Sequence, residues 1–117
     1  MNISCLIPVM LLLAFPPVEW LVPKEYDFGI VSIGNEQIHN FLFKNSTSKA
    51  VHIDNVRTTC GCTVLEWQQT PIFPDSIANI TVRFDATRLG KFKKRIKVFV
   101  SNQRKAEILE ISGEVVR

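Results

Sequence analysis

Apolar and polar side chains alternate with a period of two along most of this sequence, and this pattern constrains the fold more than any other feature. The segment 77–84 is the clearest case, because every second residue is apolar. Its expected inward side chains are Ala78, Ile80, Val82 and Phe84. Successive side chains of a β-strand point to opposite faces of the sheet, so this pattern predicts a strand with one buried face.

About seven short segments of this kind follow one another, separated by turn residues, and no long segment has a helical period. A chain of 117 residues can bury one sizeable core but not two. The pattern therefore predicts an all-β, immunoglobulin-like β-sandwich of about seven antiparallel strands over residues 24–117. The other expected inward residues are His39, Phe41, Phe43, Val51, Ile53, Phe92, Ile96, Val98, Val100, Leu109, Ile111 and Val115. Gly113 lies inside the last segment, which indicates a bulge or a close approach of another backbone.

The first 20 residues differ from the rest, since no charged residue occurs from Met1 to Val18. The apolar run from Cys5 to Phe15 has the length of a signal-peptide core and is too short to cross a bilayer as a helix. No Lys or Arg precedes it, and no clear cleavage site follows. We interpret residues 1–20 as a signal peptide or membrane-associating segment. The protein is then expected to be exported to the periplasm or cell envelope, with membrane contact only through this segment.

Two cysteines, Cys60 and Cys62, flank a single glycine in the stretch TTCGCTV. In an extended strand their Cα atoms would lie about 6.6 Å apart on one face, near the upper limit for a disulfide. A bond closed by buckling at Gly61 would be strained and suited to thiol exchange. Two thiolates on one face can instead hold Cu(I), and two small cysteine side chains can simply pack. These three alternatives stay open.

The histidines limit what metal the cysteines could share. Zinc usually takes four ligands, and His39 and His52 are the two histidines of the chain. We expect His52 to face the cysteine turn, which gives Cys60, Cys62 and His52 as the candidate metal site. His39 shares a face with two phenylalanines and is expected at the edge of the core. A complete zinc site within the chain is therefore not expected, and copper is the candidate cofactor.

Lys93, Arg95 and Lys97 form a cationic row on the outward face of one predicted strand. A short loop at 102–105 would place Lys97 opposite Glu110 and Lys93 opposite Glu114. Opposite charges across a strand pair stabilise it modestly, so we interpret the row as a paired, solvated face. The net charge of +3 is small, and few aromatic residues lie beside the row. We therefore expect no nucleic-acid partner. No Ser-His-Asp or Cys-His-Asn order is convincing either, and the chain is not expected to be an enzyme.

The whole pattern resembles the bacterial domain-of-unknown-function family 1573, which is frequent in secreted proteins of Bacteroidetes. The resemblance covers about residues 26–116, from "YDFGIVSIG" to "LEISGEV", and "TCGCT" is its most specific element. It implies an exported immunoglobulin-like domain, often with a lipid anchor, and no established reaction. One departure is Pro74-Asp75, where the family has Pro-Gly. Asp tolerates the left-handed region better than most residues, so the turn can be kept.

These features favour a non-enzymatic binding or assembly module of the cell envelope, with protein partners that contact its sheet edges and loops. The alternative is a copper-binding or thiol-redox protein that uses Cys60 and Cys62. A sandwich fold by itself does not decide between them.

Overall fold

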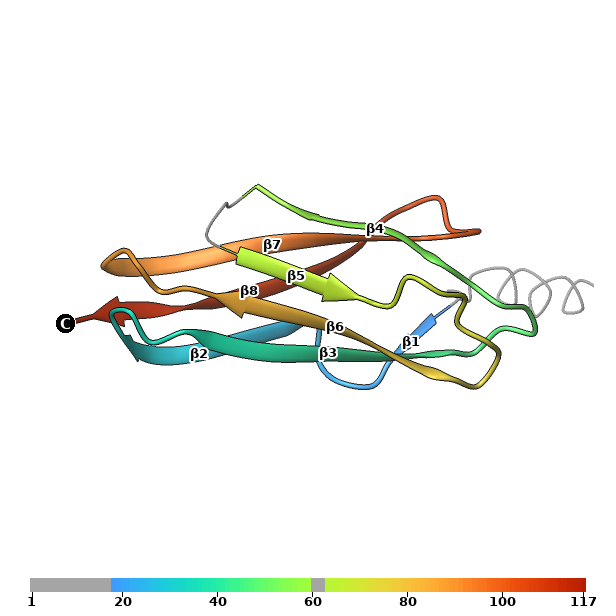
Figure 1. Cartoon of the computed structure of the whole chain (residues 1–117), viewed down its shortest axis with the longest axis horizontal. Helices are drawn as coiled ribbons and strands as arrows, with labels where there is room; N and C mark the ends of the chain where they lie inside the picture. The colour runs from blue at the N-terminus through green and yellow to red at the C-terminus, as the bar shows by residue number, and fades with distance from the viewer. Residues whose placement is uncertain (1–17, 60–62) are drawn as a thin grey trace, which may run out of the picture.

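The computed structural model describes residues 18–59 and 63–117, which form two packed β-sheets (Figure 1). The strands are β1 (Val18–Trp20), β2 (Glu25–Ser32), β3 (Gln37–Asn45), β4 (Ile53–Thr58), β5 (Thr63–Trp67), β6 (Ile77–Phe84), β7 (Gly90–Val100) and β8 (Glu107–Val116). The first sheet has the order β1-β3-β6-β5 and the second has the order β2-β8-β7-β4. The predicted all-β sandwich is confirmed. No helix of the described residues is long and apolar enough to span a membrane.

The alternation predicts the buried faces correctly. Phe41, Ile80, Ile96 and Leu109 have no exposed surface. Their neighbours along each strand, such as Asn40 and Asn79, are exposed. The two inner faces together form one hydrophobic core, and the removal of this apolar surface from water is the main term that stabilises the fold.

Two features of the topology differ from the expectation. The described residues form eight strands, because Val18–Trp20 adds a short one beside β3. β2 and β8 run parallel, whereas antiparallel strands were expected throughout. The segment after the cysteines forms β5, which lies in the opposite sheet from β4. Side-chain alternation reports which face is buried but carries no information on strand direction or on the choice of sheet.

The sandwich begins earlier than residue 24. Val18 is buried, and the ring of Trp20 packs on Phe43 at 5.1 Å between centroids. Trp20 Nε1 donates a hydrogen bond to Glu107 on β8, and Lys24 Nζ lies 2.7 Å from the same carboxylate. Residues 1–17 lie outside the described residues, so the predicted export signal stays a prediction.

The carboxyl of Glu107 is held by three donors, since Gln103 Nε2 also donates to it at 2.8 Å. Burial alone raises the pKa of Glu107, but the hydrogen bonds and the charge of Lys24 outweigh burial and bring the pKa below its ordinary value. A carboxylate with a lowered pKa stabilises the folded state at neutral pH, and this stabilisation is lost as the pH falls through the folded-state pKa. Glu107 therefore fixes the first described residues to β8 at neutral pH.

Asn45 ends β3 and is the most completely bonded polar side chain of the core. It has no exposed surface. Its Nδ2 donates to the carbonyl oxygens of Lys49 and Ile72, both at 2.8 Å, and its Oδ1 accepts from the backbone and the hydroxyl of Thr47. The side chain therefore closes the 46–50 turn and ties it to the loop before β6.

The turn before β6 keeps its geometry without glycine. The backbone N–H of Ser76 donates to the carbonyl of Phe73, which closes a four-residue turn with Pro74 and Asp75 at its centre. Asp75 has a φ of 66°, so it adopts the left-handed conformation expected for this position. Proline followed by a residue of positive φ is typical of a type II turn.

Candidate functional site

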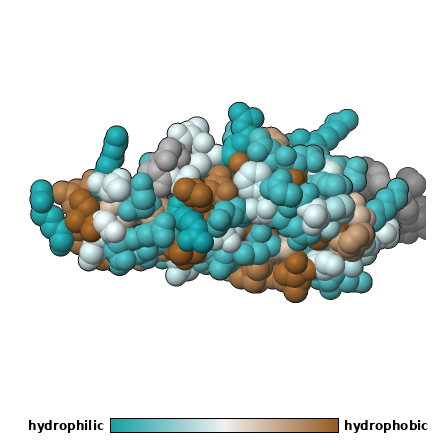
Figure 2. Space-filling model, in the orientation of Figure 1, coloured by the Kyte–Doolittle hydropathy of each residue, from teal (hydrophilic) through white to brown (hydrophobic). Residues whose placement is uncertain are grey.

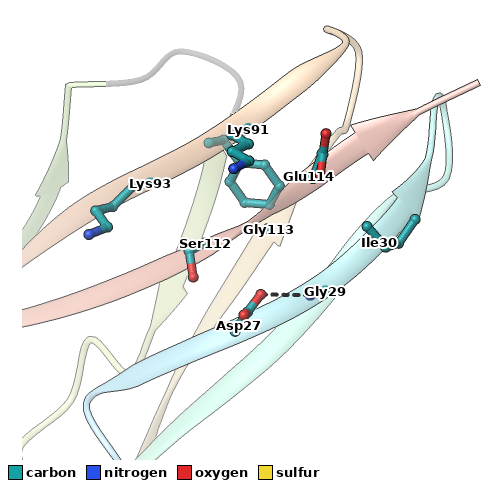
Figure 3. A pocket seen from close by; sticks show the side chains of 9 residues that line it. Asp27, Gly29, Ile30, Lys91, Lys93, Ser112, Gly113 and Glu114 are labelled. Carbon is teal, nitrogen blue, oxygen red and sulfur yellow. Dashed lines mark hydrogen bonds between the residues drawn. The ribbon is translucent and has the colours of Figure 1, made fainter.

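The outward face of the β2-β8-β7-β4 sheet carries two depressions, which are the candidate binding surfaces of the described residues. The first has a volume of about 460 Å³ and is called the glycine depression. Figure 3 shows the residues that line it, from β2, β7 and β8. They are Asp27, Gly29, Ile30, Lys91, Phe92, Lys93, Ser112, Gly113 and Glu114.

Two glycines create this depression. Gly29 has a φ of 73° and lies where the register of β2 against β8 shifts, which is a β-bulge. Gly113 pairs with Phe92 across β7 and β8. A Cβ at Gly113 would lie 2.8 Å from the Phe92 ring and 2.9 Å from the carbonyl oxygen of Gly29. The close approach predicted for Gly113 is therefore confirmed. β2 continues through this bulge from Glu25 to Ser32.

The charges around the glycine depression are mixed. Lys91 and Lys93 come from β7, whereas the carboxylates come from Asp27 on β2 and Glu114 on β8 (Figure 3). The Asp27 carboxylate already forms a hydrogen bond within the chain, since its Oδ1 accepts from the backbone N–H of Gly29 at 2.7 Å. Mixed charges give this surface no preference for anions or cations, so it has no defined ligand chemistry.

The second depression is called the basic groove and has a volume of about 400 Å³. It is lined by Arg57, Thr58, Thr59, Arg95, Lys97 and Phe99, from β4, the residue after it, and β7. The Arg57 guanidinium lies over the Phe99 ring, 5.9 Å from its centroid. The groove therefore combines three cations with one aromatic face, next to the segment that holds the cysteines.

The observed register changes the interpretation of the cationic row. Arg95 lies opposite Glu110, Lys97 opposite Ile108, Lys93 opposite Ser112 and Lys91 opposite Glu114. The predicted pairs Lys97–Glu110 and Lys93–Glu114 are wrong by two residues, because the β7–β8 ladder ends at Val98–Glu107 and the last two residues of β7 pair with β4 alone. Arg95 makes one long contact with Glu110, 3.9 Å from Nε to Oε1. Within the described residues neither Lys97 nor Lys93 forms an ion pair, so the row is not the paired face that we expected.

The structure separates His52 from the residues next to the cysteines. His52 precedes β4, and its backbone bonds to Ser101 at the end of β7. Thr58 and Thr59 lie at the other end of β4, about 20 Å away along a six-residue strand. Cys60 and Cys62 lie outside the described residues, so the disulfide, copper and packing hypotheses stay predictions. Among the described residues, no group of three or more metal-ligating side chains could hold an ion.

His39 occupies the core edge, as expected. Its ring stacks on Tyr26 at 3.8 Å and meets Phe41 edge-on at 4.6 Å. Burial lowers the pKa of His39 below its ordinary value, which favours the neutral ring. Because Tyr26 belongs to β2 and His39 to β3, the stack closes one side of the sandwich between the two sheets.

On the opposite side of the sandwich, β4 and β5 form the sheet edges. The described residues offer β5 a partner strand on one side only, β6, and the five pairs between them run in regular register. The inward residues Leu65 and Trp67 are only partly buried. The buried Nε1 of Trp67 has no hydrogen-bond acceptor among the described residues. The outward Val64 is 55% exposed. Sequence reasoning missed this edge, because strand order is not visible in side-chain alternation.

Hydrophobic side chains on the face that carries β3, β5 and β6 are dispersed. Figure 2 shows separate hydrophobic areas among hydrophilic ones on this face. Ile38, Val64 and Ile77 are exposed by 48%, 55% and 58%. Dispersed apolar residues are normal for a protein surface and do not by themselves mark a binding site. The edge of β5 and the basic groove are therefore the more informative features.

The family model that matches the sequence is described as a protein of unknown function (DUF1573), and it covers residues 21–115. This match includes the sandwich from the residue after β1 to the penultimate residue of β8. No curated protein is detectably similar to the chain in sequence.

Several solved structures share the fold at low sequence identity. The ASH / PapD-like domain of human CEP192 matches with a TM-score of 0.72 and 13% identity, over 89% of this chain and 90% of that chain. A protein of unknown function from Porphyromonas gingivalis gives 0.71 and 14%, over 86% of this chain and 50% of that one. The Vibrio cholerae VesB protease gives 0.70 and 10%, over 84% and 32%. The chain thus spans half or less of the two bacterial structures, and the likeness shows the fold alone.

Proposed function

The chain belongs to the DUF1573 family, and we propose that it is a non-enzymatic binding module that accepts an extended strand of a partner protein at the edge of β5. One observation carries this proposal. β5 is a regular edge strand, paired on one side in the described structure, with its inward Leu65 and Trp67 still partly exposed. A partner strand would pair with the backbone of Val64–Trp67 at the edge and cover Leu65 and Trp67.

The other long sheet edges are less suited to strand addition. β2 carries the bulge at Gly29, and β4 has a register shift between Ile53 and Asn55. Bulges interrupt the ladder of backbone donors and acceptors and protect an edge from pairing. The unpaired part of β3 lies beside the Tyr26–His39 stack, which occupies the side of the sandwich there. β5 has none of these protections.

We propose that the module acts at the cell envelope, because residues 1–18 carry no charge and contain the apolar run from Cys5 to Phe15. A non-enzymatic role is supported by the described residues, which bring no nucleophile, base and orienting group together at either depression. The protease among the similar structures shares only the sandwich, which covers 32% of that chain.

A second carboxylate beside Glu66 on the exposed face of β5 should weaken strand addition. Val64 points outward opposite Arg83, so Val64→Glu is compatible with the fold, and it places a charge next to the outward side chains of an added strand. We expect this variant to lose the envelope proteins that the wild-type protein captures from envelope extract. The matched control is Ile77→Glu on β6, which is exposed by 58% and lies on a strand with neighbours on both sides. Equal capture by all three proteins would contradict the proposal.

A further inference from the structure

We propose that the basic groove binds an acidic segment of a partner protein. The proposal rests on the proposed function in that it names the chemistry of the partner, but it concerns a different surface from the β5 edge. The groove is formed by β4 and β7 of the second sheet, whereas β5 belongs to the first.

The groove concentrates positive charge at a cost to folding. Arg57 and Lys97 are direct partners across β4 and β7, and like charges in this position are destabilising. On the other side of Lys97 the partner is Ile108, which offers no charge. Neither Arg57 nor Lys97 forms an ion pair within the described residues. An anionic ligand would neutralise both cations together.

The third cation, Arg95, is also accessible to a ligand. The Arg95 side chain is 76% exposed, and its single contact with Glu110 is long at 3.9 Å. Exposed ion pairs contribute little, so a carboxylate from a ligand can replace Glu110 at small cost. Guanidinium groups bind carboxylates through two parallel hydrogen bonds, and the groove offers two such groups, on Arg57 and Arg95.

The surroundings of the groove favour a short acidic peptide over a nucleic acid. Phe99 supplies an apolar face for a side chain of the ligand, and a volume of about 400 Å³ suits a few residues. The same sheet face becomes acidic beyond the groove, where Glu110 on β8 lies next to Glu25 on β2. A long phosphate backbone laid across the face would meet these carboxylates. A single aromatic residue also provides little surface for stacked bases.

The test uses a labelled peptide of about eight residues with alternating Glu and Leu, which spans about 26 Å when extended. We expect it to bind the full chain and to bind more weakly as salt increases. Lys97→Glu should lower the affinity by about tenfold or more, because the new carboxylate pairs with Arg57 and repels the peptide. Since this change replaces a like-charge pair by an opposite one, the unfolding midpoint should be no lower than that of the wild type. The control Lys105→Glu makes the same change of charge in the 101–106 connection and should leave the affinity unchanged.

The proposal is overturned by equal binding of a peptide with Gln in place of Glu, by equal losses for Lys97→Glu and Lys105→Glu, or by tighter binding of a single-stranded RNA of equal charge. Displacement of the peptide by inorganic phosphate at similar concentration would also overturn it, as a site for small anions. Val64→Glu separates this proposal from the previous one. This variant should leave the affinity for the peptide unchanged. The proposal for one surface can therefore be wrong while the proposal for the other holds.

Discussion

Asn45→Asp should lower the free energy of unfolding by about 3 kcal/mol, which is the largest effect that we expect from a single isosteric change. The aspartate keeps the oxygen that accepts from Thr47 but loses the amide that donates to Lys49 and Ile72. The replacing oxygen would face two carbonyl oxygens in a site without exposed surface. Urea unfolding followed by tryptophan fluorescence measures the change. In a domain of about 100 residues it corresponds to about 12–24 °C in Tm.

The control for this prediction is Asn40→Asp on the outward face of the same strand. Asn40 Oδ1 accepts from Asn79 and Thr81, and both contacts are exposed. The aspartate can keep both bonds, so the expected change is within about 0.5 kcal/mol. If Asn45→Asp were as mild as this control, the role of Asn45 in closing the turn would be wrong.

Gly113→Ala should destabilise the fold by about 2 kcal/mol, through overpacking between two strands. The new methyl group would lie 2.8 Å from Phe92 and 2.9 Å from the backbone oxygen of Gly29, so either the ring or the β2 bulge must move. Ser112→Ala, one residue away on the outward face, is the neutral control. Urea unfolding of all variants gives the comparison.

A double-mutant cycle with Phe92→Leu identifies the clash. Part of the contact at Gly113 is with the ring, so the cost of Gly113→Ala should be smaller in the Phe92→Leu background. The contact with Gly29 remains in both backgrounds and should keep the cost above zero. Additive effects of the two substitutions would contradict the close packing of Phe92 on Gly113.

The sequence predicts the fold class and the buried faces because both depend on local alternation. The inward and outward residues of β3, β6, β7 and β8 can be assigned from a period of two alone. The left-handed conformation of Asp75 was also predictable, since Pro followed by Asp is a local turn signal. Gly113 was recognised as a position of close approach because a glycine inside a strand is also a local signal.

What could not be predicted depends on distant residues. The register of β7 against β8 is set by where the ladder ends, at Val98–Glu107, and an error of two residues leaves every side chain on its correct face. The sequence pattern therefore gives no sign of the error. The register nevertheless decides which lysines lie opposite a carboxylate. The parallel pairing of β2 with β8 and the placement of β5 in the first sheet are likewise invisible in the local pattern. Both candidate binding surfaces arise from these long-range choices.

Neither candidate surface was predicted as a binding site, because the cationic row was interpreted as a paired, solvated face and the β5 edge was not recognised. The sequence drew attention to the cysteine turn and to the cationic row, and the basic groove lies where the row meets the strand before that turn. The expected grouping of His52 with the cysteines has no support in the described structure, because His52 lies at the other end of β4.

Hydrogen exchange of the β5 backbone, with and without a captured partner protein, tests strand addition most directly. The partner's backbone would bond to the free edge, so amides within Val64–Trp67 should exchange more slowly in the complex, while those of the bulged β2 edge should be unchanged. Protection confined to other strands, with β5 exchanging as fast as in the free protein, would contradict the proposed function.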